Sequence, residues 1–446
     1  MSLIKSIVWL SFMLSFLEST ASQNANSKRL VCYFNADSLL ANGYAKFTMA
    51  HLNRAASLCT HLAYDSAFLQ PQSFALRLSK APITTNDIRL QYPHLKLYLT
   101  LGGDKDGHEP YIALLASNRS QQLKFIQNCV EEVKRLGFDG LDLAFPLPRN
   151  KPSEETSVAM FFKDLAKIWS DKKMDKYKEK YTSLVNEMKE AFDKAKLSLV
   201  MTVLPNVNSS LYFDVPKIQH SFEFINLFAF DFNTPERNPS EADYSAPLFM
   251  NRKQHRLPYA NVDFQVSHWL NNGCPASQLN LGVATYGRAW NMTLESGLSG
   301  EPIVEHTLAN VGFGKHFLKN GSISWTNICF HLPPQQRHGV SLSQITDEYG
   351  NYAFRPANKN GTRGYWISFD DPQFAARKAK YVNEKALGGV AVFDINRDDF
   401  KSICRGTEGF PILQAIRRTL NIEQTPQRRS FATLQKKLAN ALKFIG

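Results

Sequence analysis

The chain has 446 residues, a formal net charge of +12 and a pI near 9.3. This basic balance favours acidic glycans or anionic cell surfaces over nucleic acid as partners, although it could serve only to keep the protein soluble. The length allows one large α/β barrel with an insertion, or two or three ordinary domains.

The N-terminal residues have the features of a secretory signal peptide. Lys5 precedes an apolar run from Ile7 to Leu17, and the small residues Ser19 to Ser22 follow. The run is shorter than the roughly 20 residues that a spanning helix needs, and no later segment approaches that length. The sequence therefore predicts a signal peptide at 1–22 and a soluble, secreted, extracellular protein.

Eight short apolar runs alternate along the chain with amphipathic helical stretches, a pattern typical of parallel strands joined by crossover helices. Eight repeats fit a closed (β/α)8 TIM barrel, an α/β fold whose functional face lies at the carboxyl ends of its strands. An open doubly wound sheet is the alternative, but no glycine-rich phosphate loop follows the first strand. The predicted strands are Leu30–Phe34, His61–Tyr64, Lys96–Leu101, Gly140–Phe145, Leu197–Val203, Phe224–Phe230, Leu279–Ala284 and Gly389–Phe393.

Two connections are longer than one crossover helix requires. The first contains a charge-rich stretch at 149–180, which we expect to be a solvated excursion. The second, between strands seven and eight, leaves room for a small α+β insertion subdomain at 291–364. The barrel itself is then predicted at 23–290 and 365–420.

The six cysteines should mostly pair in an oxidising compartment, although spacing alone does not choose the connectivity. One pair flanks the first strand and the helix after it, and another lies in the last third of the chain. One of the other two belongs to the apolar stripe of a helix. We predict the bridges Cys32–Cys59 and Cys329–Cys404, with Cys129 and Cys274 unpaired.

Five sequons for N-linked glycans occur, each with a non-proline residue in the middle position. We expect at least one of them to carry sugar. They begin at Asn118, Asn208, Asn291, Asn320 and Asn360.

The fourth predicted strand and its flanks, Phe138–Pro146, form the most informative segment of the chain. Alternate residues of a strand share a face, so Asp142, Ala144 and Pro146 should project together toward the barrel mouth. Three carboxylates in that arrangement would make a proton-donating acid with neighbours that tune it. Here only the first position is a carboxylate.

Several ordered motifs resemble those of the family 18 chitinases, and more closely those of the insect imaginal disc growth factors, a chitinase-like group without hydrolase activity. The resemblance covers most of the chain from Leu30 to Leu420. Its motifs are Leu97–Gly103, Gly137–Asp142, Asn226–Asp231, Ala284–Trp290 and Gly388–Phe393, and the growth-factor branch is indicated by the long excursion after strand four and by Leu204–Ser210.

Active members of the wider family carry Asp-x-x-Asp-x-Asp-x-Glu on strand four, which matches Asp139, Asp142, Ala144 and Pro146 here. The resemblance implies that the terminal Glu would protonate the leaving oxygen while the preceding Asp steadies the substrate acetamide. Loss of a positioned acid costs on the order of 10²–10⁴-fold in rate. Proline has neither a side-chain proton nor an amide hydrogen, so we expect no enzyme activity and assign no catalytic residue.

A relocated acid would rescue catalysis, and the nearest following carboxylates are Glu154 and Glu155. These residues lie on the charged excursion, where the apolar packing that raises the pKa of a catalytic acid is lacking. The sequence contains no HExxH, CxxC or clustered His pair, so we expect neither a metal site nor a cofactor.

The resemblance implies that Asp231, Tyr286 and Arg288 match positions that contact sugar in chitin-binding barrels. Two replacements weaken that match. Phe393 stands where such barrels stack a Trp beneath the sugar, and Phe is a smaller platform without an indole N–H. Phe230 replaces a Tyr whose hydroxyl would bind the acetamide.

The alternative interpretation of these residues is structural. Asp231 would be a satisfied buried carboxylate with Arg288 as its partner, and Trp290 and Trp366 would be ordinary core aromatics.

The C-terminal segment, 421–446, is basic and draws an apolar stripe on a helix. Such a helix could lie on anionic membranes or bind acidic glycosaminoglycans, or it could dock on the barrel or fray. The stripe consists of Phe431, Leu434, Leu438, Leu442 and Ile445.

The resemblance implies a secreted, glycosylated, non-catalytic growth factor that promotes cell proliferation, polarisation and motility together with insulin-like peptides. We expect a monomer whose partner is a cell-surface receptor or insulin-like signalling complex, and no nucleic acid. The alternative is a lectin of cuticle or wound response that binds chitin or its oligosaccharides without hydrolysis.

Overall fold

The computed structural model describes residues 28–43, 46–81, 85–148, 172–251, 257–309, 321–332, 342–404, 406 and 408–423. The predicted signal peptide, most of the charged excursion with Glu154 and Glu155, the sequon at Asn320 and residues 424–446 of the C-terminal segment lie outside the described residues.

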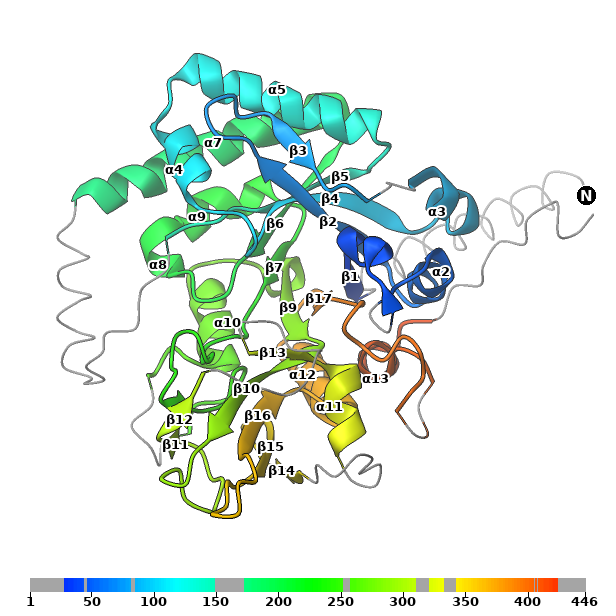
Figure 1. Ribbon diagram of the computed structural model, residues 1–446. Helices are drawn as coiled ribbons and strands as arrows, with labels where there is room; N and C mark the ends of the chain where they lie inside the picture. The colour runs from blue at the N-terminus through cyan, green and yellow to red at the C-terminus, as the bar shows by residue number, and fades with distance from the viewer. Residues whose placement is uncertain are drawn as a thin grey trace, which may run out of the picture.

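Eight parallel strands close into a barrel, which confirms the predicted fold (Figure 1). The ring closes because β1 pairs with both β2 and β17, while the short β3 (Leu76–Leu78) extends β2 outside it. All eight predicted strands are present. In ring order they are β1 (Arg29–Asn35), β2 (His61–Leu69), β4 (Lys96–Gly102), β5 (Gly140–Ala144), β6 (Ser198–Val203), β7 (Ile225–Leu227), β9 (Leu279–Ala284) and β17 (Gly389–Phe393).

Helices lie outside the ring of strands (Figure 1), and their inward faces are apolar. Helix α5 (Arg119–Arg135) is typical: it begins where the Asn118 side chain accepts a hydrogen bond from the Gln121 amide, and it buries Phe125 and Cys129. The other described helices of the barrel are α2 (Met49–Ala56), α3 (Thr85–Gln91), α4 (Glu109–Ala116), α7 (Lys172–Ala195), α8 (Ser209–Tyr212), α9 (Val215–Ile218), α10 (Val262–Asn271), α12 (Pro372–Glu384) and α13 (Pro411–Thr419), with short 3-10 turns at Ala36–Leu40, Gln219–Ser221 and Ala276–Gln278.

The predicted excursion at 149–180 is wrong at its C-terminal end, because α7 begins at Lys172. Tyr177 packs against the core between strands and helices, and the next helical turn buries Tyr181. The lysines of this segment made it look solvated throughout. An amphipathic helix also carries many polar residues, on the side that faces away from its apolar contacts.

The insertion subdomain is built on an antiparallel sheet with the strand order β12-β10-β16-β15-β14. Strand β13 pairs with the first three residues of β10, Tyr286 to Arg288. Trp290 and Trp366 face each other across β10 and β16 and are fully buried, as the structural interpretation of these residues predicts. The elements are β10 (Tyr286–Met292), β12 (Thr307–Leu308), β13 (Ser322–Ser324), α11 (Trp325–His331), β14 (Ser343–Thr346), β15 (Asn351–Arg355) and β16 (Tyr365–Phe369), beside the pair β8 (Glu241–Ala242) and β11 (Val304–Glu305).

This sheet extends past the predicted bounds of 291–364 at both ends. Strand β10 starts at Tyr286 and β16 ends at Phe369, and the two pair from Arg288 with Ser368 onward. The chain therefore enters the subdomain directly after barrel strand β9 and leaves it directly before α12, so the subdomain stands at the barrel mouth (Figure 1).

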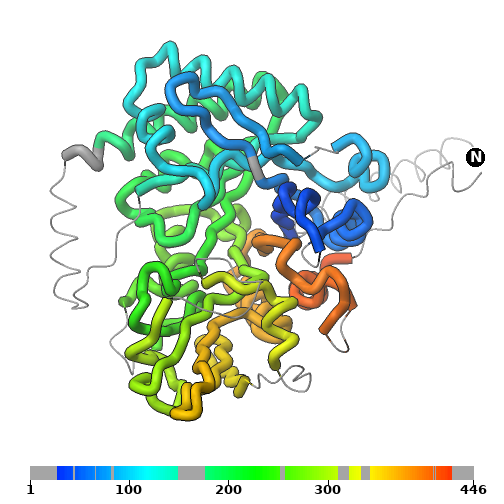
Figure 2. Tube along the Cα trace, viewed as in Figure 1, coloured from blue at the N-terminus to red at the C-terminus, as the bar shows by residue number. Residues whose placement is uncertain are grey.

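Both predicted disulfides are present, Cys32–Cys59 and Cys329–Cys404. Cys129 and Cys274 are buried and unpaired, and burial raises the pKa of the Cys274 thiol to about 12. The second bridge ties α11 of the subdomain to the segment after β17. That segment returns beside the start of the barrel (Figure 2), where Phe400 packs on Phe47.

Candidate functional site

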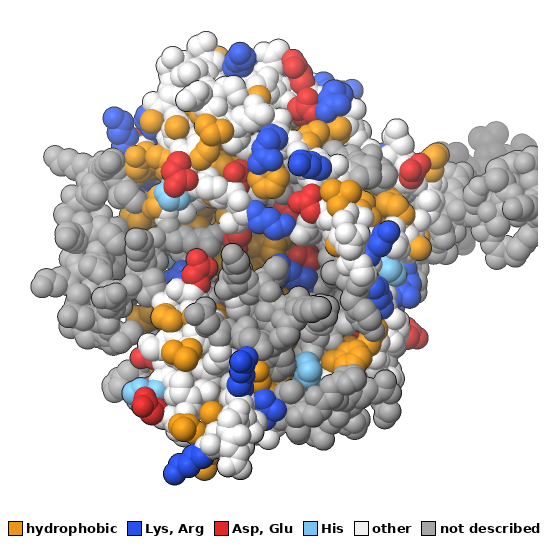
Figure 3. Space-filling model, in the orientation of Figure 1, with side chains coloured by type: hydrophobic (Ala, Val, Ile, Leu, Met, Phe, Trp, Pro, Cys, Tyr) orange, Lys and Arg blue, Asp and Glu red, His pale blue; other side chains and the backbone are white. Residues whose placement is uncertain are grey.

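A cavity of about 200 Å³ opens at the carboxyl ends of the barrel strands, where this fold places functional sites. Charged side chains of both signs border the hollow on the face shown in Figure 3. Nearly every strand of the barrel contributes to the wall. The lining residues are Tyr33, Asp65, Thr100, Gly102, Gly103, Asp104, Lys105, Ala144, Thr202, Leu204, Phe228, Tyr286, Arg288, Phe393, Asp394 and Arg397.

Asp142 lies inside the barrel beneath this cavity and is 1% exposed. Its carboxylate accepts hydrogen bonds from Tyr33 (2.8 Å), Thr100 (3.0 Å) and Thr202 (2.7 Å). Burial raises the pKa of Asp142 to about 6, although the three hydroxyl donors oppose that rise. The carboxylate is thus held by the chain's own groups rather than presented to a ligand.

The next inward position is a methyl group. Strand β5 ends at Ala144, which lines the cavity. Pro146 is buried but is not part of the cavity lining, and a Cβ added to Gly102 would lie 2.9 Å from the Pro146 ring. Of the positions 142, 144 and 146, only Ala144 is part of the cavity lining, and the projection of Pro146 toward the mouth stays a prediction.

Asp139 is not brought to the cavity. It lies before β5, at the opposite end of the barrel, where its carboxylate bonds Arg89 at 3.1 Å and accepts from the Leu97 amide at 2.8 Å. Its role in the structure is to hold α3 and β4 together.

Asp231, Tyr286 and Arg288 do come together, and they bond one another. Both carboxylate oxygens of Asp231 accept hydrogen bonds, from the Tyr286 hydroxyl at 2.7 Å and from Arg288 at 2.7 and 2.5 Å. Burial alone would raise the pKa of Asp231, but Arg288 and these hydrogen bonds outweigh it and lower the pKa. This arrangement is the satisfied buried pair of the structural interpretation.

Phenylalanines close the floor of the cavity. Phe393 lies 5.1 Å from Phe228 between ring centroids, stacks with Phe230 at 6.2 Å and meets Tyr33 edge-on at 5.6 Å. None of the three phenylalanine rings carries a hydrogen-bond donor, so the floor can bury an apolar face but cannot orient a polar group.

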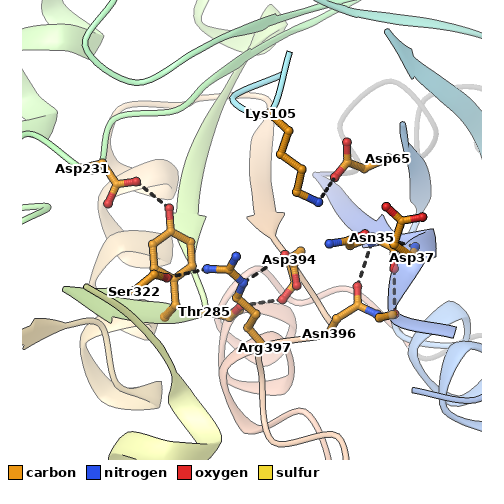
Figure 4. A network of polar contacts seen from close by, with 12 residues as sticks. Asn35, Asp37, Asp65, Lys105, Asp231, Thr285, Ser322, Asp394, Asn396 and Arg397 are labelled. Carbon is orange, nitrogen blue, oxygen red and sulfur yellow. Dashed lines mark hydrogen bonds and ion pairs between the residues drawn. The ribbon is translucent and has the colours of Figure 1, made fainter. Parts of the chain in front are cut away.

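Charged pairs stand on the cavity wall (Figure 4). Lys105 lies 3.9 Å from Asp65, and Arg397 lies 3.5 Å from Asp394. Asp394 is 2% exposed, and burial raises its pKa while Arg397 opposes the rise. Among the described residues no group donates a hydrogen bond to the Asp394 Oδ1 atom.

The hydroxyl groups around Asp142 and the charged pairs on the wall were not predicted from the sequence. Alternation within the strands would have placed Tyr33, Thr100 and Thr202 inside the barrel. Asp394 directly follows β17 and Lys105 lies in the loop after β4, which are the expected positions for site residues in this fold.

Four sequons fall on described residues. Asn118 and Asn208 cap α5 and α8, Asn291 pairs with Leu308 in the subdomain sheet, and Asn360 is exposed in a turn. In the described ranges no group of three or more His, Cys, Asp or Glu side chains could hold a metal ion. No helix in the same ranges is long and apolar enough to cross a membrane.

The profile described as glycosyl hydrolases family 18 matches residues 29–398. Among curated relatives, chitinase-like protein Idgf1 of Drosophila melanogaster is 44% identical over 433 residues, covering 92% of this chain and 98% of the relative. Its namesake from Glossina morsitans morsitans is 42% identical, covering 88% and 94%.

Solved structures with the same fold are more distant in sequence. The second catalytic domain of the group II chitinase of Ostrinia furnacalis is 24% identical with a TM-score of 0.73, covering 90% of this chain and 99% of that one. Human YKL-39, described as a pseudo-chitinase with retained chitooligosaccharide binding, is 24% identical with a TM-score of 0.71, covering 89% of this chain and all of that one.

Proposed function

The chain belongs to glycosyl hydrolase family 18, and we propose that within this family it is a secreted, non-catalytic growth factor. It would promote cell proliferation, polarisation and motility through a surface receptor, in cooperation with insulin-like peptides. The growth-factor role rests on the resemblance of the sequence to imaginal disc growth factors and on the similarity to the Idgf relatives.

The single observation that carries the proposal is the chemistry of β5. Asp142 is locked by three hydroxyl groups, the next inward position is Ala144, and Pro146 is buried against Gly102. Glycoside cleavage needs a carboxylic acid beside the scissile oxygen. A barrel that lacks such an acid at the end of β5 is suited to act by binding a partner at its surface.

Secretion is supported by the predicted signal peptide and by the two disulfides, since such bridges persist in oxidising compartments. The basic net charge of +12 would favour retention near anionic cell surfaces.

A cell assay tests the growth-factor proposal. Purified secreted protein is added to cultured insect cells over a range of doses, with and without insulin, and cell number is recorded. We expect dose-dependent proliferation that increases in the presence of insulin. Heat-unfolded protein is the control, and an Asp142→Asn variant should be as active as wild type because no chemistry is required. Cell numbers that stay at the buffer level at every dose would reject the proposal.

Saccharide binding without hydrolysis is the second candidate, and Asp394 favours it. The free Oδ1 of this buried, cavity-lining carboxylate can accept a hydrogen bond from a ligand hydroxyl, and the phenylalanine floor can bury the apolar face of a sugar ring. The pseudo-chitinase YKL-39 is described as retaining such binding.

Calorimetric titration with chitotetraose distinguishes this candidate. Binding that Asp394→Asn weakens, while the matched Asp139→Asn control does not, would support it. The absence of binding heat at millimolar chitotetraose would reject saccharide binding and would not affect the growth-factor proposal.

A further inference from the structure

A second cavity, of about 240 Å³, lies beside the barrel between the segment after β6 and helix α10. Side chains from the end of β6, the start of α8, the segment after β7 and α10 line it. It shares only Leu204 and Phe228 with the cavity at the barrel mouth. Those two side chains therefore form the wall between the two spaces.

Most of the second cavity is apolar. Val207 and Phe232 are each 6% exposed and form part of the inner wall. Tyr259 and Phe264 stand on its outer side, and Phe264 is 45% exposed despite its apolar ring. An exposed aromatic at the edge of an apolar cavity is typical of a ligand site that is open to solvent.

One buried polar group points to a ligand. Ser209 lines the cavity and is 4% exposed, and within the described part of the chain its hydroxyl has no hydrogen-bond partner. A buried hydroxyl without a hydrogen-bond partner destabilises the folded protein. A bound molecule with an acceptor atom would remove that destabilisation.

The charge of the lining selects the class of ligand. Arg237 and His268 lie on the lining, and among the described lining residues there is no Asp or Glu. Lys178 adds a second positive charge nearby, since it donates to the carbonyl of the lining residue Ser210 at 3.1 Å. His268 is a polar but neutral part of the lining at neutral pH, because burial and then Lys178 lower its pKa. The mouth cavity differs, because Asp65, Asp104 and Asp394 line it.

We propose that the second cavity binds a small apolar carboxylic acid, of the class of medium-chain fatty acids. The alkyl chain lies among Phe232, Tyr259 and Phe264, and the carboxylate faces the Arg237 guanidinium. Ser209 supplies a further hydrogen-bond donor. The cavity volume of about 240 Å³ lies just below the range of roughly 300–1,000 Å³ that is usual for drug-sized ligands, which suits a smaller ligand such as octanoate. The proposal does not depend on the growth-factor function.

Titration calorimetry of the full-length secreted protein with octanoate tests the proposal, and octanol serves as the uncharged comparison. We expect octanoate to bind at least tenfold more tightly than octanol. Arg237→Gln should weaken octanoate binding by about tenfold or more, since hydrogen bonds to charged groups are worth about 1.5–3 kcal/mol. The matched control Arg135→Gln, on the exposed face of α5, should not change it.

Two further variants keep the test decisive if Arg237→Gln fails to fold. Ser209→Ala, which removes one oxygen atom, should weaken binding severalfold, and Val207→Trp, which fills the cavity, should abolish it. Equal affinities for octanol and octanoate, or no heat at millimolar octanoate, would overturn the proposal. Loss of octanoate binding in Phe393→Trp with retention in Val207→Trp would assign the ligand to the mouth cavity instead and would also overturn it.

Discussion

Replacing Asp142 with asparagine should change how the stability of the protein depends on pH. The folded-state pKa of this carboxyl is raised by burial from 3.8 to about 6. The folded protein therefore binds a proton that the unfolded chain has already lost between these values. Stability consequently falls as the pH rises through this window, and the full cost of ionising Asp142 is present above pH 6.

The magnitude follows from the difference between the two pKa values. Each tenfold change in the dissociation constant is worth about 1.4 kcal/mol, so ionised Asp142 costs about 3 kcal/mol of folding free energy at pH 7. Asparagine has nearly the same shape and no charge, and its carbonyl oxygen can still accept from Thr100 or Thr202. The free energy of unfolding of Asp142→Asn, relative to wild type, should therefore rise by about 3 kcal/mol between pH 3.5 and pH 7.

Urea unfolding of both proteins at several pH values, with disulfides intact, measures this difference. Asp231→Asn is a control with the opposite sign. The pKa of Asp231 is lowered because Arg288 and the hydrogen bonds outweigh burial, so its ionised form stabilises the protein at neutral pH and the stabilisation is lost as the pH falls. A difference between Asp142→Asn and wild type that does not change with pH would refute the reasoning.

Three further predictions follow from other contacts. Replacing both Cys329 and Cys404 by alanine should lower the free energy of unfolding by up to about 4 kcal/mol, the chain-entropy value for a loop of 75 residues, measured by urea unfolding; an unchanged midpoint would contradict this. Lys378→Met should lower the free energy of unfolding, measured in urea, by about 3–5 kcal/mol, because Lys378 bonds Asp370 at 2.6 Å and both side chains are buried. Adding Asp370→Asn should recover part of this loss, and a single variant as stable as wild type would contradict a stabilising role of the ion pair. Pro146→Glu alone should restore no chitobioside turnover, since the preceding inward position still lacks a carboxylate; hydrolysis by this variant would show that one acid suffices.

The barrel could be predicted from the sequence because each strand is a short apolar run between amphipathic helices. The Cys32–Cys59 bridge could be predicted because its two cysteines flank the first strand and the helix after it. Pairing within a local unit leaves few alternatives. The predicted boundary was less accurate at the start of α7, because a lysine-rich segment can be either a solvated loop or part of an amphipathic helix.

The surroundings of Asp142 could not be derived from spacing alone. Thr100 faces Asp142 only because β4 and β5 pair in one particular register, and Tyr33 and Thr202 come from strands far away in the chain. The second cavity could not be predicted from the sequence, because it depends on how α10 packs beside the segment after β6.

We propose that this family 18 barrel does not cleave glycosidic bonds, and a hydrolysis assay measures such cleavage. Purified secreted protein is incubated with a fluorogenic chitobioside from pH 4 to pH 8, beside an active family 18 chitinase. We expect fluorescence release equal to that of buffer at every pH. Release well above buffer that disappears in an Asp142→Ala variant would contradict the claim, because it would show that the carboxylate beneath the cavity still takes part in catalysis.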